Sequence, residues 1–242
     1  MNYSTTNSNF RSWVLFLLVK LLKFKQSQKL LWYLETLVLS TRFVQKNLEF
    51  AKSKTNGYSQ FLPNREAVFK KMVPLIKSES IAYEFGVADG KLTKFWSGID
   101  CGIYKWFGFD TFEGLPTDWF RNKVSVLPKG TFSFLKNSET DFPVIKAKFD
   151  VKWIVGLIEE TLVPFLVKNS CESHQKIIFI DVDLYYPTKI ILESFKPLLL
   201  PNDLIYFDEG FDPWNEGQAL DEVLSNYEIM HFSPSCLLVK IT

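Results

Sequence analysis

The sequence predicts an α/β fold: a three-layer, doubly wound sheet of mostly parallel strands that follows an N-terminal helical extension. Strand-length and helix-length segments alternate from residue 81 onward, and two strand-like segments close the chain. Two apolar runs, residues 178–180 and 204–207, each end in acids and lie a helix length apart, as parallel neighbours often do. The 242 residues, 47% of them hydrophobic, suffice for one such domain and an appendage. We therefore expect an extension over residues 1–63 and an α/β domain over residues 64–242.

The local pattern predicts each element of this domain in turn. Asn64 is a suitable helix N-cap, and Pro74 ends or kinks the helix that runs towards Ile76. Apolar and aromatic runs predict strands at residues 81–85, 102–109, 144–149, 176–180, 203–207, 228–232 and 236–241. The intervals between them predict helices at residues 91–96, 151–167, 188–199 and 219–224.

The N-terminal extension is basic and apolar. Residues 12–54 have the apolar spacing of a helix, and the first acid of the chain is Glu35. The apolar run at residues 13–19 is shorter than the ~20 residues that span a bilayer, and no small-residue cleavage site of a signal peptide follows it. Two interpretations stay open. The helix packs on its own domain as a lid, or on a second subunit of a homo-oligomer; or residues 11–30 lie on an anionic membrane surface.

Composition restricts the classes of function. Lys and Arg number 28 against 27 acids, so there is no global electrostatic basis for binding nucleic acid. The three cysteines are scattered without CxxC spacing, which favours a reduced cytoplasmic protein, either free or on the inner membrane face, over a disulfide framework. Only two histidines are present, which argues against a histidine-rich metal site or a Ser/His pair.

The turn after the first strand reads Glu84-Phe-Gly86-Val-Ala-Asp89-Gly90. Gly86 and Gly90 allow close approach of the backbone to a ligand. The dinucleotide pattern GxGxxG is absent, and Glu84 and Asp89 would repel a pyrophosphate. A cationic ligand fits better, and S-adenosylmethionine carries a sulfonium and an ammonium. The alternative is a plain turn in which Asp89 caps the next helix.

The second strand ends in Gly-Phe-Asp110-Thr111-Phe112-Glu-Gly-Leu-Pro. An acid at this position is suited to accept hydrogen bonds from both hydroxyls of a ribose. We expect Asp110 to bind the ribose of the cofactor, with Thr111 beside it and the Phe112 ring on the purine face. The alternative is a solvated turn without a ligand.

Four acids follow the two apolar runs: Asp181, Asp183, Asp208 and Glu209. If the two strands are parallel neighbours, these side chains meet at one edge of the sheet, where open α/β sheets bind ligands. Such a cluster is costly unless a cation or a shared proton offsets the repulsion. The sequence thus indicates an oxygen-liganded metal site with a base beside it; the alternative is that some of these acids cap helices or pair with lysines.

Taken in order, these motifs resemble the macrocin O-methyltransferase family of class I S-adenosylmethionine-dependent methyltransferases. The motifs are Glu84-x-Gly-x-x-x-Gly, residues 108–116, Gly156 to Leu162, residues 180–185 and Phe207-Asp-Glu, and the resemblance covers about Asn64 to Leu224. It implies a Rossmann-like fold, S-adenosylmethionine as methyl donor, a magnesium ion, and a sugar hydroxyl as acceptor.

The resemblance also implies roles for the acids. Asp181, Asp208 and Glu209 would hold Mg²⁺ or another divalent cation, Asp183 would be the general base, and Asp181 would also lie at the cofactor. One position differs, because the family has Asp-Asp where this chain has Asp208-Glu209. The expected function is metal-dependent O-methyl transfer to a sugar, glycoside or other polyhydroxylated acceptor. The alternatives are a nucleotide-sugar or NAD-dependent enzyme on a similar sheet, and a catalytically silent binding protein.

Overall fold

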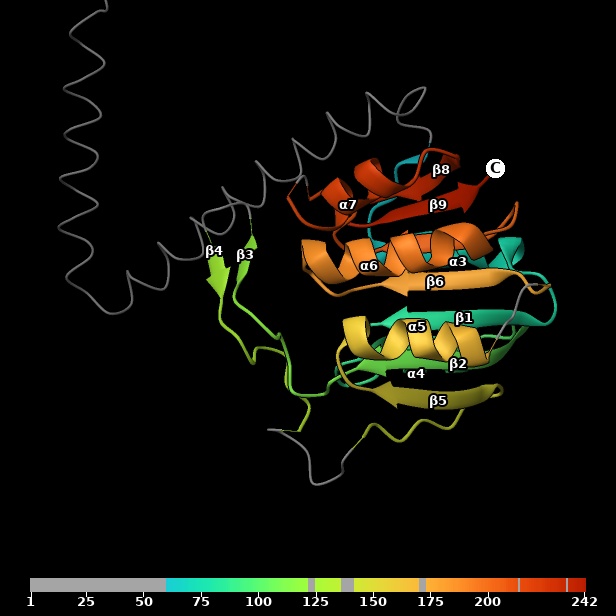
Figure 1. Cartoon of the computed structure of the whole chain (residues 1–242). Helices are drawn as coiled ribbons and strands as arrows, with labels where there is room; N and C mark the ends of the chain where they lie inside the picture. The colour runs from blue at the N-terminus through green and yellow to red at the C-terminus, as the bar shows by residue number, and fades with distance from the viewer. Residues whose placement is uncertain (1–59, 122–124, 136–141, 170–172, 213, 234) are drawn as a thin grey trace, which may run out of the picture. The chain divides into compact units, whose positions relative to one another are not determined.

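Seven strands form one mixed, mostly parallel sheet in the computed structural model (Figure 1). The structure describes residues 60–121, 125–135, 142–169, 173–212, 214–233 and 235–242. The strands are β1 (Ser80–Phe85), β2 (Ile103–Asp110), β5 (Asp150–Val155), β6 (Lys176–Ile180), β7 (Leu204–Phe207), β8 (Tyr227–Phe232) and β9 (Leu237–Ile241). Their order is β5-β2-β1-β6-β7-β9-β8. The first five are parallel, and β9 is antiparallel to both β7 and β8.

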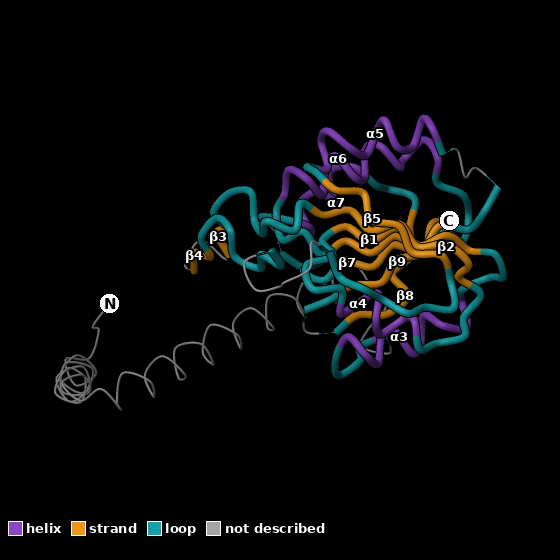
Figure 2. The backbone as a smooth tube through the Cα atoms, turned by 90° about the horizontal axis from the view of Figure 1, so that it is seen from below, coloured by secondary structure: helices purple, strands orange, loops and turns teal. Residues whose placement is uncertain are grey.

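Helices cover both faces of the sheet, which confirms the predicted three layers (Figure 2). They are α3 (Arg65–Met72), α4 (Lys91–Ser97), α5 (Ile158–Lys168), α6 (Tyr185–Phe195) and α7 (Glu216–Val223). Buried side chains of α5, α6 and α7 pack with one set of strand side chains, and those of α3 and α4 pack with the alternate set. This division follows from the period of two along a strand, which sends successive side chains to opposite faces.

The first described helix begins as its cap predicts. The Asn64 Oδ1 atom accepts a hydrogen bond of 2.9 Å from the Ala67 backbone N–H. Pro74 lies in a 3₁₀ turn, Val73–Leu75, directly after α3, so the regular helix ends before the proline. The predicted helix over residues 12–54, the membrane or subunit contact at residues 11–30 and most of the predicted extension 1–63 lie outside the described residues.

The third strand is displaced from its predicted position. Residues 144–149 are irregular, and the strand is β5, which pairs with β2 from Lys105–Asp150 to Asp110–Val155. The helix predicted from residue 151 begins only at Ile158. At this edge of the sheet Val151 and Trp153 pack on one core cluster and Ile154 on the other, so the run alternates as a strand.

A small hairpin between β2 and β5 was not predicted. Strands β3 (Trp119–Arg121) and β4 (Ser125–Leu127) pair antiparallel. Each has three residues, too few for a periodic pattern to be recognised. In the described part of the chain, no helix has the length and apolar character that a membrane crossing requires.

The tips of four strands end on one line. Phe85 of β1 is in register with Phe109 of β2 and with Ile180 of β6, and Ile180 is in register with Phe207 of β7. The next residue in each strand is therefore at the same edge of the sheet: Gly86, Asp110, Asp181 and Asp208. Hydrogen bonds from Gly86 N to Phe109 O, Asp181 N to Phe85 O and Asp208 N to Ile180 O continue the ladder to this edge.

Candidate active site

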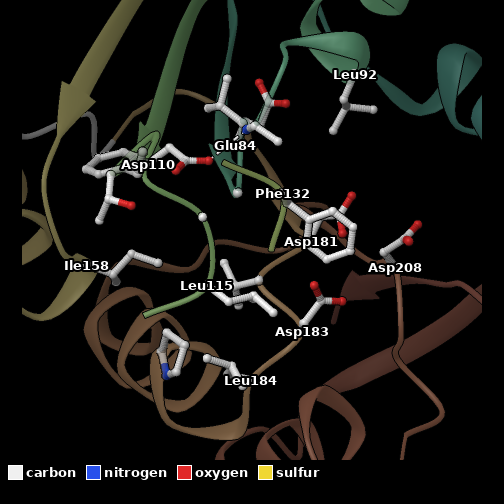
Figure 3. A pocket seen from close by; sticks show the side chains of 18 of the residues that line it. Glu84, Leu92, Asp110, Leu115, Phe132, Ile158, Asp181, Asp183, Leu184 and Asp208 are labelled. Atoms are coloured by element: carbon white, nitrogen blue, oxygen red, sulfur yellow. Dashed lines mark hydrogen bonds between the residues drawn. The ribbon is translucent and has the colours of Figure 1, made fainter. Parts of the chain in front are cut away.

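A cavity of about 650 Å³ opens at the C-terminal edge of the parallel strands (Figure 3). Such a position is where open α/β sheets bind ligands. All four predicted rim acids line this cavity, and so do Asp110, Thr111, Glu84 and Gly86. In Figure 3, Asp181, Asp183 and Asp208 are grouped on one side, and Asp110 is on the other. The hairpin and its flanking loops add apolar lining: Leu115, Trp119, Leu127 and Phe132.

The grouped acids repel one another. The pKa of Asp181 lies well above its ordinary value, first because burial disfavours the charged form and then because Asp208 and Asp183 are nearby. Arg65 acts in the opposite direction on the pKa of Asp181. The excess of negative charge at this end of the cavity is the condition under which a cation binds favourably.

Among the described residues, Arg65 brings a positive charge to the acids of this rim. Its Nη2 atom lies 2.6 Å from Asp208 Oδ2, and the Tyr206 hydroxyl donates to Asp208 Oδ1 at 2.7 Å. Burial lowers the pKa of Arg65, but the attraction of Asp208 and its neighbours outweighs this effect and raises it. Arg65 is the first residue of α3, so the helix that Asn64 caps also positions the Arg65 guanidinium at the rim. The sequence does not indicate Arg65 as a site residue, because a single arginine after a cap forms no recognisable pattern.

Asp183 adopts an unusual backbone conformation. Its φ is +63°, in the left-handed region that a side chain disfavours, and Leu184 N donates to Val182 O at 2.7 Å to close a tight three-residue turn. The side chain lines the cavity and is 9% exposed. The turn therefore gives Asp183 a direction different from that of Asp181, although the two are only two residues apart.

The donor chemistry at the rim fits a hard divalent cation. Asp181, Asp208 and Glu209 offer carboxylate oxygens, the ligands that Mg²⁺ prefers, and the crowded charge favours a cation there. Within the described residues, however, no three His, Cys, Asp or Glu side chains form a ready-made metal site. Both oxygens of Asp208 already accept hydrogen bonds, from Arg65 and Tyr206. A metal would therefore compete with Arg65 for Asp208.

Glu84 is enclosed at the other end of the site. Its Oε2 accepts hydrogen bonds from the Thr93 hydroxyl and from Trp106 Nε1, and no described residue donates to its buried Oε1. Burial raises the pKa of Glu84 to about 8, although the bonds from Thr93 and Trp106 lower it. Glu84 lines the cavity, and an ammonium group bound there would donate to Oε1 and favour the charged carboxylate; S-adenosylmethionine carries such a group.

Asp110 ties two loops together at the tip of β2. Ala88 N donates to its Oδ2 and Phe112 N to its Oδ1, each at 2.7 Å. A carboxylate has about four acceptor sites, so two backbone bonds leave capacity for the two hydroxyls of a ribose. Thr111 also faces the cavity. These positions are compatible with the predicted cofactor contacts.

Phe112 and Gly90 differ from the expectation. The Phe112 ring is fully buried, packs against Phe134, Phe142 and Trp153, and is not among the lining residues. Burial in this aromatic cluster stabilises the apolar ring more than a place at the cavity wall would, so its contact with a purine stays a prediction. Gly90 does not line the cavity either: a Cβ there would meet Pro143 and Ile145.

Gly86 lines the cavity, but its missing side chain has another reason. A Cβ at Gly86 would lie 1.9 Å from the Asp181 carbonyl oxygen, and its φ is +89°. The glycine thus lets the turn after β1 approach the tip of β6. Close approach to a ligand is not what the structure requires of it.

Comparison with known proteins identifies the fold. Neither the models of protein families nor the curated proteins give a match by sequence. The crystal structure of CalS11, a calicheamicin methyltransferase, superposes with a TM-score of 0.53 at 21% identity, over 72% of this chain and 76% of that chain. This chain has a class I methyltransferase-like α/β fold. At this identity the likeness concerns the fold alone.

Two further structures are more distant. The apo structure of CalS11, described as a TDP-rhamnose 3'-O-methyltransferase, has a TM-score of 0.48 at 18% identity, over 83% of this chain and 93% of that one. The O-methyltransferase NovP has a TM-score of 0.47 at 16% identity, over 74% and 77%. The fold assignment rests on the CalS11 crystal structure.

Proposed function

We propose that this chain is a metal-dependent O-methyltransferase that moves a methyl group from S-adenosylmethionine to a hydroxyl of a sugar or another polyhydroxylated acceptor. The observation that carries the proposal is that Asp110 and Asp183, the predicted ribose acceptor and the predicted base, line one cavity from opposite sides. That separation leaves room for two reactants in a single site. The class I methyltransferase-like fold supports the donor, and the motif resemblance supports the sugar acceptor.

The chain's own residues would act as follows. Glu84, Asp110 and Thr111 bind the donor, whose sulfonium supplies the methyl group. Asp183 accepts the proton of the acceptor hydroxyl, and the oxygen then forms its bond to the methyl carbon as the carbon–sulfur bond breaks, leaving S-adenosylhomocysteine. Alignment of the two reactants in one cavity contributes up to about 7–11 kcal/mol in favourable systems.

The metal would be held by Asp181, Asp208 and Glu209. A bound divalent cation lowers the pKa of a hydroxyl that it coordinates, which makes the proton easier for Asp183 to accept. Glu209 has one methylene more than the aspartate of the resembled family, so its carboxylate reaches further from the backbone. The remaining role, that of Arg65, is to neutralise Asp208 while the rim carries no metal.

The test is methyl transfer from labelled S-adenosylmethionine to a panel of sugars, glycosides and glycolipids, with and without EDTA. Calorimetry with S-adenosylmethionine, NAD and UDP-sugars identifies the cofactor. We expect binding of S-adenosylmethionine alone, and transfer that EDTA abolishes and Mg²⁺ restores. Transfer that resists EDTA would remove the metal from the proposal, and binding of NAD or a UDP-sugar in place of S-adenosylmethionine would contradict it.

Asp183→Asn is the informative variant in this assay. It keeps the size of the side chain and removes the basic oxygen, so we expect S-adenosylmethionine affinity to persist while turnover falls by a factor on the order of 10²–10⁴, the usual contribution of a general base. Normal turnover in Asp183→Asn would show that another group takes the proton.

A further inference from the structure

Glu216 joins the tips of the two acid-bearing strands. It is the first residue of α7 and is fully buried. Its Oε1 accepts hydrogen bonds from Val182 N at 3.3 Å and Asp183 N at 3.2 Å, and its Oε2 accepts one from Glu209 N at 3.0 Å. One carboxylate thus holds the segment that follows β6 and the segment that follows β7.

The position of Glu216 is itself fixed. A Cβ at Gly217 would lie 2.7 Å from the Gly210 carbonyl oxygen and 2.8 Å from that of Asp212, so the start of α7 is in close contact with the loop after β7. Asp212 stabilises the same loop, because its carboxylate accepts hydrogen bonds from Trp214 N and Asn215 Nδ2. A side chain held this firmly can define the positions of the groups that it binds.

The two amides that Glu216 Oε1 binds belong to the turn around Asp183. A left-handed residue other than glycine costs on the order of 1–3 kcal/mol and persists only where its surroundings impose it. Burial, and then the nearby Asp181, raise the pKa of Glu216 well above its ordinary value, and the carboxyl group keeps acceptor capacity for these amides in either protonation state. Glu216 thus supplies an interaction that favours the observed backbone of Asp183, and it does so without lining the cavity.

We infer that Glu216 is a positioning residue, which sets the orientation of Asp183 and its distance from Glu209 through the three backbone hydrogen bonds. The inference rests on the proposed function, because it assigns Asp183 as the base. Glu216 touches neither reactant; it acts through the backbone of the residues that do.

The test compares Glu216→Gln with Glu222→Gln. The glutamine at position 216 retains one carbonyl acceptor and presents an NH₂ group where a second acceptor is needed, so one strand tip loses its bond. Glu222 lies on the same helix, but it is exposed and bonds to the side chains of Tyr185, Lys189 and Gln218. It provides a matched loss of one carboxylate outside the site.

We expect Glu216→Gln to lower kcat by a factor on the order of 100, as a misplacement of about 1 Å does. The Kd for S-adenosylmethionine, measured by calorimetry, should stay as in the wild type. Amide hydrogen exchange should become faster at Val182, Asp183 or Glu209. Glu222→Gln should leave kcat and these amides unchanged. A merely stabilising residue would lower the unfolding temperature without this selective loss of kcat.

Three outcomes separate the possibilities. If the wild type transfers methyl and Glu216→Gln matches Glu222→Gln in kcat, the inference is wrong and the proposed function stands. If the wild type neither binds S-adenosylmethionine nor transfers methyl, the proposed function fails, and with it the role of Glu216 as a positioning residue. If Glu216→Gln does not fold, Glu216→Asp, which keeps the carboxyl group but cannot reach both tips, must show the same loss of kcat. Failure of both variants to fold also overturns the inference.

Discussion

The acidic residues of the cavity lie in different environments, and each environment determines whether the carboxyl group is charged or neutral. Glu84 is enclosed by Thr93 and Trp106, and its pKa is raised to about 8. Asp110 is bound by two backbone amides, and Asp183 is held in a left-handed turn. Desolvation favours the neutral form of a carboxyl group, and hydrogen-bond donors favour the anion. The sequence therefore predicts that an acidic residue is present, but the protonation state of that residue depends on the groups that surround it in the fold.

The raised pKa of Glu84 predicts a pH dependence of stability. Its pKa is about 8 in the folded chain against an ordinary 4.5, so between these values the folded state retains a proton that the unfolded state has lost. The contribution of Glu84 to stability therefore falls as pH rises from about 5 to about 8, by an amount on the order of a few kcal/mol. Glu84→Gln cannot titrate, so urea unfolding from pH 5 to pH 9 should show the variant gaining stability relative to wild type across this window.

Glu193→Gln is the control, because Glu193 lies on the exposed side of α6. Its stability should follow the wild-type curve over the whole range. Parallel curves for Glu84→Gln and wild type would mean that Glu84 is already ionised in the folded protein at pH 5.

The acids that line the cavity can be predicted from the sequence, whereas the residues that bond to them at the rim cannot. Asp110, Asp181, Asp183 and Asp208 were predictable because each follows an apolar strand, and parallel strands share an edge. Arg65 comes from a helix start that is 143 residues from Asp208 in the sequence, and Glu216 begins the helix that follows β7 but bonds back to the segment after β6. Such contacts depend on tertiary packing, so neither the periodicity of apolar residues nor the spacing of motifs in the sequence predicts them.

At the level of elements, strands buried on both faces were the easiest to predict. Residues 176–180 form β6 as expected, since all five are buried and the run is nearly all apolar. Edge strand β5 has only exposed and partly buried residues, so its sequence lacks the continuous apolar run of a buried strand and instead predicts the start of a helix. The predicted strand at 144–149 failed because Val144 is 84% exposed and the segment pairs with nothing in a sheet.

The junction between β1 and β6 depends on a glycine. In Gly86→Ala the new Cβ would clash with the Asp181 carbonyl oxygen at 1.9 Å, in a backbone with a φ of +89°. The left-handed conformation alone costs a residue with a Cβ about 1–2 kcal/mol. We expect the free energy of unfolding to fall by more than about 2 kcal/mol in denaturant titrations.

Gly98→Ala is the matched control for this substitution. Gly98 has a φ of −83°, and the nearest heavy atom to an added Cβ is 3.6 Å away. Its effect should stay within about 0.5 kcal/mol. Equal effects at Gly86 and Gly98 would contradict the close contact between the two strand tips.

For the molecule as a whole, the sheet order and the position of the cavity follow from the parallel strands, whereas the charge balance of the rim does not. Four strand tips aligned in register bring several acids to one edge, and in the described rim Arg65 forms the ion pair that offsets them. The folded state therefore carries an electrostatic cost that the unfolded chain, with its acids dispersed in water, avoids. Anything that binds positive charge at the rim should stabilise the whole domain.

This balance predicts that Mg²⁺ raises the unfolding temperature of the protein. A ligand that binds only the folded state stabilises it by about 2.7 kcal/mol at 100 times its Kd. Asp208→Asn removes one charge and one ligand, so Mg²⁺ should stabilise this variant less. Arg65→Gln frees an oxygen of Asp208, so half-maximal stabilisation should occur at a lower Mg²⁺ concentration.

NaCl at matched ionic strength is the control, because it screens charges without binding specifically at the rim. If Mg²⁺ leaves the unfolding temperature unchanged while S-adenosylmethionine raises it, the rim does not bind the metal, and Arg65 is its permanent counter-charge.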